Sequence, residues 1–162
     1  MTLTILGSVA LSLGILLLGG LLLNRVPLVD PPGFKKRLAL YLTTNVAETR
    51  TDNPFPELQP VRYQLDAPTL LDLARQTVAE LGWTETHYSE AALEIRAIVQ
   101  TRLWRFNDDV IIRIESGDRD AGVYVRSQSR VGKGDLGANT RHVLDFYQAL
   151  EPRVKRAISS GQ

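Results

Sequence analysis

The chain of 162 residues has no cysteine, only two histidines and a single methionine. The absence of cysteine excludes disulfide bonds, thiolate metal sites and cysteine nucleophiles. His87 and His142 lie far apart and form no ligand spacing such as HxxxH, so we expect no metal and no other cofactor. The chain also has no large excess of basic or of acidic residues. The 19 basic and 18 acidic residues give a net charge of +1, which offers no signal for a nucleic-acid partner.

Charge is absent altogether from residues 3–23, a run of 21 residues rich in leucine. A helix of this length, rising about 1.5 Å per residue, matches a hydrocarbon core of about 30 Å. The run therefore predicts a single transmembrane helix over residues 1–24. A cleaved signal peptide is the alternative, but it needs a basic start and a small-residue cleavage site. No Lys or Arg precedes Arg25, which favours a retained anchor.

Basic residues follow this run, and only the amino terminus precedes it. By the positive-inside rule, Arg25, Lys35, Lys36 and Arg37 place the following domain on the cytoplasmic or stromal side. We therefore expect a single-pass membrane protein, with membrane lipids among the partners. Residues 25–60 are predicted to be a juxtamembrane segment and a proline-rich loop. Within them, residues 34–42 have helical spacing and either lie on the membrane surface or pack on the domain.

Residues 61–160 are predicted to form one α+β domain. A helix is expected over residues 67–81, with Asp66 as its cap and Pro68 in its first turn. Residues 93–104, 109–115 and 121–129 alternate apolar and polar side chains, and Asn107 and Asp108 are expected to make the first turn between them. Their short connections indicate an antiparallel β-meander, and a last helix begins near Asn139. The predicted fold is an N-terminal transmembrane helix followed by this meander, packed by two helices.

The polar face of the meander is expected to carry arginines around aromatic side chains. Cross-strand pairing gathers these residues on it: Arg96, Arg102, Trp104, Arg113, Tyr124 and Arg126. Facing like charges destabilise a sheet unless something neutralises them. A bound anion or an acidic partner is one solution. The other is neutralisation by the chain's own acids, for which Glu48, Asp52, Glu57, Glu94 and Glu115 are candidates.

Residues 132–137 match the pattern GxGxxG between a predicted strand and a predicted helix. A dinucleotide-binding domain needs a further parallel strand after that helix, and the remaining chain holds none. The glycines either serve backbone geometry, or they open a helix N-terminus that holds an anion with Arg130 and Lys133. A triad of Ser129, His142 and Asp145 lacks the nucleophile elbow and oxyanion arrangement of a hydrolase, so we expect no catalytic residues.

Two stretches carry a family resemblance: Phe106-Asn107-Asp108-Asp109-Val110, and residues 125–139 with the sequence VRSQSRVGKGDLGAN. They resemble the DUF1499 family, whose members share an FxDDx hairpin and an RSxSRVGxxDLGxN signature. The resemblance covers about residues 43–150, and it departs from many members in lacking their cysteine near residues 44–49. It implies a domain of unknown function, often near membranes, with homologues in cyanobacteria and plastids.

The resemblance also implies that the residues of the motif form one structural unit. Its members here are Asp108, Asp109, Arg126, Ser127, Ser129, Arg130, Asp135, Gly137 and Asn139. Arg126 or Arg130 is expected to pair with one of the three aspartates and so tie the hairpin to the loop.

Two functional hypotheses follow. The first is a membrane-anchored, non-enzymatic accessory or assembly protein of a larger membrane complex. The family resemblance makes a photosynthetic complex a candidate partner and the thylakoid a candidate membrane. The alternative is a binder of a small anionic ligand or lipid headgroup on the arginine-rich face.

Overall fold

The protein is built around one antiparallel sheet of six strands. The structure is a computed structural model that describes residues 2–101 and 105–160. Within these ranges, side chains are described at residues 11 and 12 and from residue 14 onward. The strand order is β1-β6-β5-β4-β3, and β2 also pairs with β6. The strands are β1 (Val46–Glu48), β2 (Val61–Tyr63), β3 (Thr84–Ser89), β4 (Glu94–Gln100), β5 (Asn107–Ser116) and β6 (Ala121–Ser129). Strand β6 therefore pairs with three others, whereas β3 pairs only with β4.

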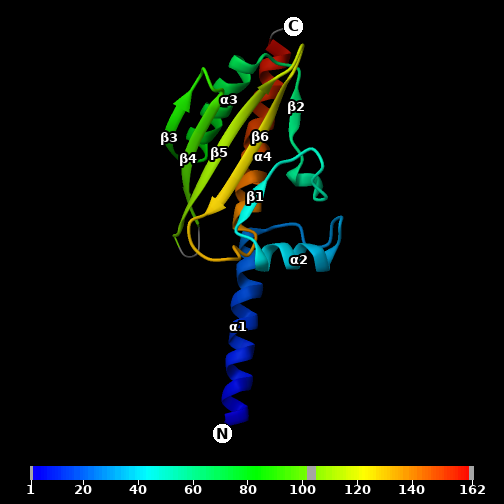
Figure 1. The fold of residues 1–162 in the computed structure, drawn as a ribbon, viewed down its shortest axis with the longest axis vertical. Helices are drawn as coiled ribbons and strands as arrows, with labels where there is room; N and C mark the ends of the chain where they lie inside the picture. The colour runs from blue at the N-terminus through cyan, green and yellow to red at the C-terminus, as the bar shows by residue number, and fades with distance from the viewer. Residues whose placement is uncertain (1, 102–104, 161–162) are drawn as a thin grey trace.

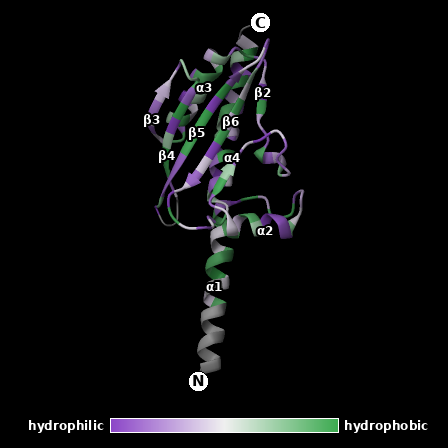
Figure 2. Ribbon diagram, in the orientation of Figure 1, coloured by the Kyte–Doolittle hydropathy of each residue, from purple (hydrophilic) through white to green (hydrophobic). Residues whose placement is uncertain are grey.

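The predicted meander is present as β4, β5 and β6. Val110, Ile112 and Ile114 of β5 are buried, and the residues between them point to the other face. The same alternation is visible as changing colour along the strands in Figure 2. An alternating strand buries one face and leaves the other to polar side chains, which is why the sequence pattern located these three strands.

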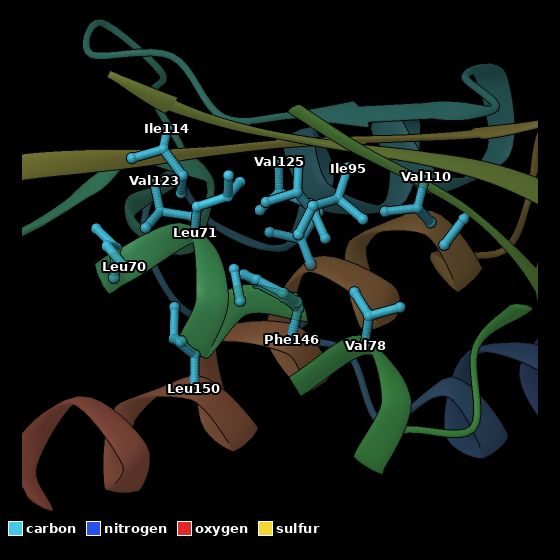
Figure 3. Close-up of a cluster of buried hydrophobic side chains, with 14 of the residues drawn as sticks. Leu70, Leu71, Val78, Ile95, Val110, Ile114, Val123, Val125, Phe146 and Leu150 are labelled. Carbon is cyan, nitrogen blue, oxygen red and sulfur yellow. The ribbon is translucent and has the colours of Figure 1, made fainter. Parts of the chain in front are cut away.

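Two helices cover the apolar face of the sheet, α3 (Ala67–Glu80) and α4 (Ala138–Ser160) (Figure 1). The Asp66 carboxylate caps α3 by accepting a hydrogen bond of 2.8 Å from the Thr69 amide, as the sequence predicts. Figure 3 shows the core between the layers, where Leu71 of α3 and Phe146 of α4 face the strand residues. Each helix thus buries its apolar stripe against the sheet.

The segment between residues 25 and 60 is more ordered than predicted. It contains α2 (Phe34–Thr43), strand β1 and a 3-10 turn, η1 (Pro56–Leu58). Arg37 of α2 is fully buried, pairs with the Glu57 carboxylate and donates to the backbone oxygen of Asp30 at 2.8 Å. Of the two predicted settings for this helix, the structure therefore has α2 packed on the protein.

Helix α1 (Thr2–Asn24) points away from the sheet in Figure 1. Its last turn belongs to the domain: Leu21 is buried, and the Asn24 amide donates to the backbone oxygen of Leu136 at 2.9 Å. Among the described residues we find no helix with both the length and the apolar character to cross a membrane. The predicted transmembrane helix, and the single-pass membrane localisation drawn from it, are therefore wrong. Hydropathy does not reveal that the end of the run packs against protein.

Candidate functional site

Strand β5 starts earlier than predicted and carries an aspartate into the interior. Asn107 and Asp108 belong to this strand and do not form the predicted turn; Asp108 lies opposite Ser129 of β6. Asp108 is two residues before Val110, so its side chain points to the same, helix-covered face. It is completely buried. The alternation that placed Val110 inward thus places a carboxyl group at the end of the core.

Asn139, near the start of α4, links four separate parts of the chain. Its side-chain nitrogen lies 2.8 Å from the Ser129 hydroxyl, 2.9 Å from the backbone oxygen of Asn45 and 2.6 Å from a carboxylate oxygen of Asp135. Its side-chain oxygen accepts a hydrogen bond of 2.6 Å from the Ser127 hydroxyl. Because Asn139 is fully buried, these bonds satisfy a group that would otherwise destabilise the interior.

Asp135 caps the first turn of α4. Its carboxylate accepts hydrogen bonds from the amides of Gly137 at 2.8 Å and Asn139 at 2.9 Å. Burial raises the pKa of this carboxyl, and the same hydrogen bonds oppose that rise. An anion at this helix N-terminus would use the same amides that the Asp135 carboxylate already binds. The negative charge of Asp135 would therefore repel the anion predicted there.

The charged residues of the glycine-rich loop, Arg130 and Lys133, have different surroundings. Arg130 forms a two-pronged ion pair with Asp109, with nitrogen-to-oxygen distances of 2.6 and 2.9 Å, and so ties the loop to the β5 hairpin. Lys133 is exposed at the loop. Gly134 packs against the backbone of Leu42, where any side chain would collide. Gly134 therefore serves close packing.

His142 of α4 approaches two of these buried groups through one ring nitrogen. Its Nδ1 lies 3.2 Å from the Ser127 hydroxyl and 3.6 Å from Asp108 Oδ2. A serine–histidine–aspartate relay needs the serine and the acid on different ring nitrogens. Asp145, the acid of the triad considered from the sequence, is paired with Arg141 instead. The arrangement therefore does not provide an activated serine.

The Asp108 carboxyl has few hydrogen-bond donors around it, the Ser129 hydroxyl among them. Within the described part of the chain, neither of its oxygens has a hydrogen-bond partner. Burial raises its pKa from 3.8 to about 6; the Ser129 hydroxyl across the ladder opposes the rise, and the charge of Asp135 adds to it. A buried acceptor without a donor carries a free-energy cost that a bound donor would relieve.

A cavity of about 290 Å³ lies against this carboxyl, between the end of α1, the glycine-rich loop and the start of β5. Leu23, Phe106, Val131 and Leu136 make its wall largely apolar, and Phe106 and Val131 remain exposed, which opens the cavity to solvent on their side. Asp108 and Asp135 are the charged residues that line it among those described. The cavity therefore joins an apolar wall to an acidic end.

A second cavity of about 290 Å³ adjoins the first, and the two share Leu23, Asn24, Thr101 and Ala138 in their linings. His142 and Trp83 line this second space, with their rings in edge contact at 6.1 Å between centroids. The end of α1 thus lies between two cavities that meet Asp108 from one side and His142 from the other. We call the two together the loop cavities.

The predicted arginine-rich face pairs largely with acids of the chain itself. Arg96 and Arg113 both donate to the Glu94 carboxylate, at 2.6 and 2.7 Å. Arg126 donates to the Gln128 side chain at 2.7 Å and lies 4.0 Å from Glu48.

The same face contains a small hollow, and two of its predicted residues are not described by the structure. Tyr124, Arg113 and Arg126 border a hollow of about 100 Å³. Arg102 and Trp104 lie outside the described residues.

Sequence reasoning missed the buried cluster of Asp108, Ser127, Asn139 and His142 as a site beside a cavity. The signal was present in the alternation of the strands. Asp108 is in phase with Val110, and Ser127 is in phase with Val125, so the start of β5 and the end of β6 both carry polar residues on the buried face. Metal binding finds no support, because no three acidic or histidine side chains of the described chain gather closely enough to hold an ion.

Several solved structures are similar to the chain. A START superfamily protein from Mycobacterium smegmatis has 13% sequence identity and a TM-score of 0.44, over 69% of this chain and 98% of that one. A conserved protein from Geobacillus kaustophilus has 12% identity and a TM-score of 0.29, over 60% and 93% of the two chains. Both scores are below 0.5, so neither likeness bears on function. No curated protein matches the chain.

The model of a protein family described as a protein of unknown function, DUF1499, matches residues 28–150. This range contains the buried cluster and most residues that line the loop cavities. The match confirms the resemblance expected from the two motifs, and the chain therefore belongs to the DUF1499 family.

Proposed function

We propose that this protein is a non-catalytic binding protein that holds a small, mainly apolar ligand in the loop cavities. The observation that carries the proposal is the Asp108 carboxyl, buried and without a hydrogen-bond partner among the described residues, at the end of an apolar cavity. Ligand sites commonly combine an apolar wall with a few convergent polar groups, in volumes of about 300 Å³ and above. The absence of a serine relay around His142 favours binding over hydrolysis.

A series of straight-chain alcohols tests the binding function without assuming the charge of the ligand. Backbone amide shifts of residues 131–137 are followed by NMR while butanol, hexanol and decanol are added to the full chain. We expect saturable shifts whose affinity rises with chain length until the cavity is filled, because each buried methylene contributes about 0.8 kcal/mol.

Val131→Trp provides the matched test of the site. Val131 is exposed at the cavity, so the larger ring should obstruct it without disturbing the core. Val29→Trp is the control, since Val29 is exposed elsewhere. Weaker binding in the first variant alone supports the proposal, whereas equal binding in both variants, or no saturable binding to the unchanged chain, refutes it.

A second candidate function, as an accessory or assembly protein of a larger complex, is favoured by α1. This helix extends away from the domain in Figure 1. Large apolar side chains of the helix are exposed. The exposed residues, with their exposed fractions, are Leu11 (67%), Ile15 (63%), Leu18 (55%) and Leu22 (61%). Apolar surface of this extent marks interaction sites in many proteins. Photosynthetic complexes remain the first to examine, from the family resemblance.

The accessory function is tested by purifying the tagged chain from its own cells and comparing it with an Ile15→Lys variant. We expect the unchanged chain in a complex of fixed stoichiometry and the variant as a free chain. A monomeric unchanged chain, or a complex that Ile15→Lys leaves intact, contradicts this function. Lys35→Ala, on α2, is the control for a change of surface charge.

A further inference from the structure

Asp108 differs from Asp109 and Asp145 because no Arg or Lys of the described residues pairs with it, and its one ion-pair contact among them is with the His142 ring. Arg130 of the neighbouring loop is paired with Asp109, and Arg141 of α4 is paired with Asp145. The nearest ionisable ring, His142, keeps its Nδ1 3.6 Å from Asp108 Oδ2, beyond hydrogen-bond distance. The carboxyl is thus fully buried, with neither a hydrogen-bond partner nor a paired arginine or lysine among the described residues.

The surroundings of this carboxyl are electronegative. Asp135 lines the same cavity, and its oxygens accept hydrogen bonds from Gly137 and Asn139. Because those bonds already occupy Asp135, Asp108 is the acid with capacity for a new donor. A guest that brought a negative charge would face two carboxyl groups, and no Lys or Arg lines this cavity among the described residues.

We propose that the ligand of this cavity is an amphiphilic primary amine, whose ammonium group binds Asp108 and whose apolar part lies against Leu23, Phe106 and Leu136. This inference rests on the proposed binding function and adds the class of ligand. An ammonium group has three donors and a positive charge, so it supplies both of the things that Asp108 lacks. Charge-assisted hydrogen bonds in a poorly solvated site are stronger than neutral ones.

Three probes with one carbon skeleton separate charge from apolar contact. Hexylamine, hexanol and hexanoate are titrated into the full chain at pH 7.5, where the amine is protonated, and amide shifts of residues 131–137 report binding. We expect hexylamine to bind at least about tenfold more tightly than hexanol, and hexanoate more weakly than both. Asp108→Asn keeps the shape of the side chain and removes its charge. It should abolish the preference for the amine while hexanol still binds.

The outcomes separate the ligand class from the site. Equal binding of hexylamine and hexanol, or a preference for hexanoate, overturns the amine inference and leaves the proposed binding function standing. Failure of all three probes to bind overturns both. An amine preference that survives Asp108→Asn also overturns the inference, because recognition then depends on another group. Asp109→Asn, one residue away on the opposite face of β5, is the control and should leave the preference unchanged.

Discussion

The buried carboxyl group of Asp108 contributes to the pH response of the folded protein. The pKa of Asp108 is raised from 3.8 to about 6, chiefly because burial penalises its charged form. The stability contributed by the protonated group is therefore fully present below pH 3.8 and is lost as the pH rises through about 6. At neutral pH the folded chain bears a charge that the unfolded chain would solvate better.

Asp108→Asn should therefore stabilise the protein at neutral pH and not at acidic pH. The change in pKa corresponds to a penalty of about 3 kcal/mol, which the amide does not carry. We expect the difference in unfolding free energy between the variant and the unchanged chain to grow from pH 4 to pH 7 and then level off. Urea denaturation at half-unit pH steps measures this difference.

Asp109→Asn is the control because the neighbouring carboxylate has the opposite environment. The Arg130 side chain lowers the pKa of Asp109 by hydrogen bonding. The stability from that pair is present above the unfolded pKa and is lost as the pH falls. Removing the charge of Asp109 should therefore cost stability at neutral pH. A pH-independent effect of Asp108→Asn would contradict our account of this residue.

Asn139→Ala should destabilise the protein strongly. The change removes one hydrogen-bond partner each from the Ser127 hydroxyl, the Ser129 hydroxyl and the Asn45 carbonyl, at a position without access to solvent. Unsatisfied buried groups cost about 1–3 kcal/mol each, so we expect a loss of about 3 kcal/mol in unfolding free energy. Chemical denaturation measures it, with the exposed Asn107→Ala as control. A loss equal to that of the control would show that the hydrogen bonds of Asn139 do not stabilise the fold.

At the scale of elements, the glycine-rich loop is shaped by contacts with segments distant in sequence. A methyl group on Gly134 would come within 2.3 Å of the backbone oxygen of Leu42, whereas one on Gly132 would lie 3.5 Å from its nearest neighbour. Backbone cannot move aside as a flexible side chain can. The loop and the end of α2 are therefore fitted to one another.

We predict that Gly134→Ala destabilises the protein more than Gly132→Ala. The first change should cost about 1–3 kcal/mol as overpacking. The second should cost only about 1 kcal/mol, because alanine is strained at the φ of +90° that Gly132 adopts. Thermal unfolding of both variants decides the order. The reverse order would mean that backbone conformation, and not the contact with Leu42, governs this loop.

The elements differ in how far the sequence predicted them, for physical reasons. Strands β4, β5 and β6 alternate over enough residues to be recognised, and α3 has a cap and an apolar stripe. Strand β1 has three residues, too few for a periodic signal, and exists through its pairing with β6. Asp108 was predicted to lie in a turn because Asn and Asp favour turns, although its phase with Val110 already placed it inward.

The binding cluster itself depends on tertiary structure. Asn139 contacts Asn45, Ser127 and Ser129, which lie in three different positions of the chain, and no spacing rule links them. The residues of the arginine-rich face, by contrast, could be predicted from the sequence. Its members were recognised from the sequence, and the question left open there was whether acids of the chain would pair with them. Glu94 alone pairs with both Arg96 and Arg113.

For the molecule as a whole, strand β6 is the point where the sheet is joined together. It pairs with β5 on one edge and with β1 and β2 on the other. We predict that amide hydrogen exchange is slowest in β6 and the facing part of β5, and fastest in the edge strand β3, because central strands open only with the whole domain. Mass spectrometry of deuterated peptides measures this. Faster exchange in β6 than in β3 would contradict the prediction.

The same pairing has a consequence for the nascent chain. Val46 of β1 and Val61 of β2 find their partners, Gln128 and Val123, only after 82 and 62 further residues have been synthesised. Such distant pairings close late, because the entropy of a long loop must be lost before any contact repays it. During synthesis the first third of the chain therefore has unpaired strand edges. We expect chaperones that shield such edges to bind the nascent chain first.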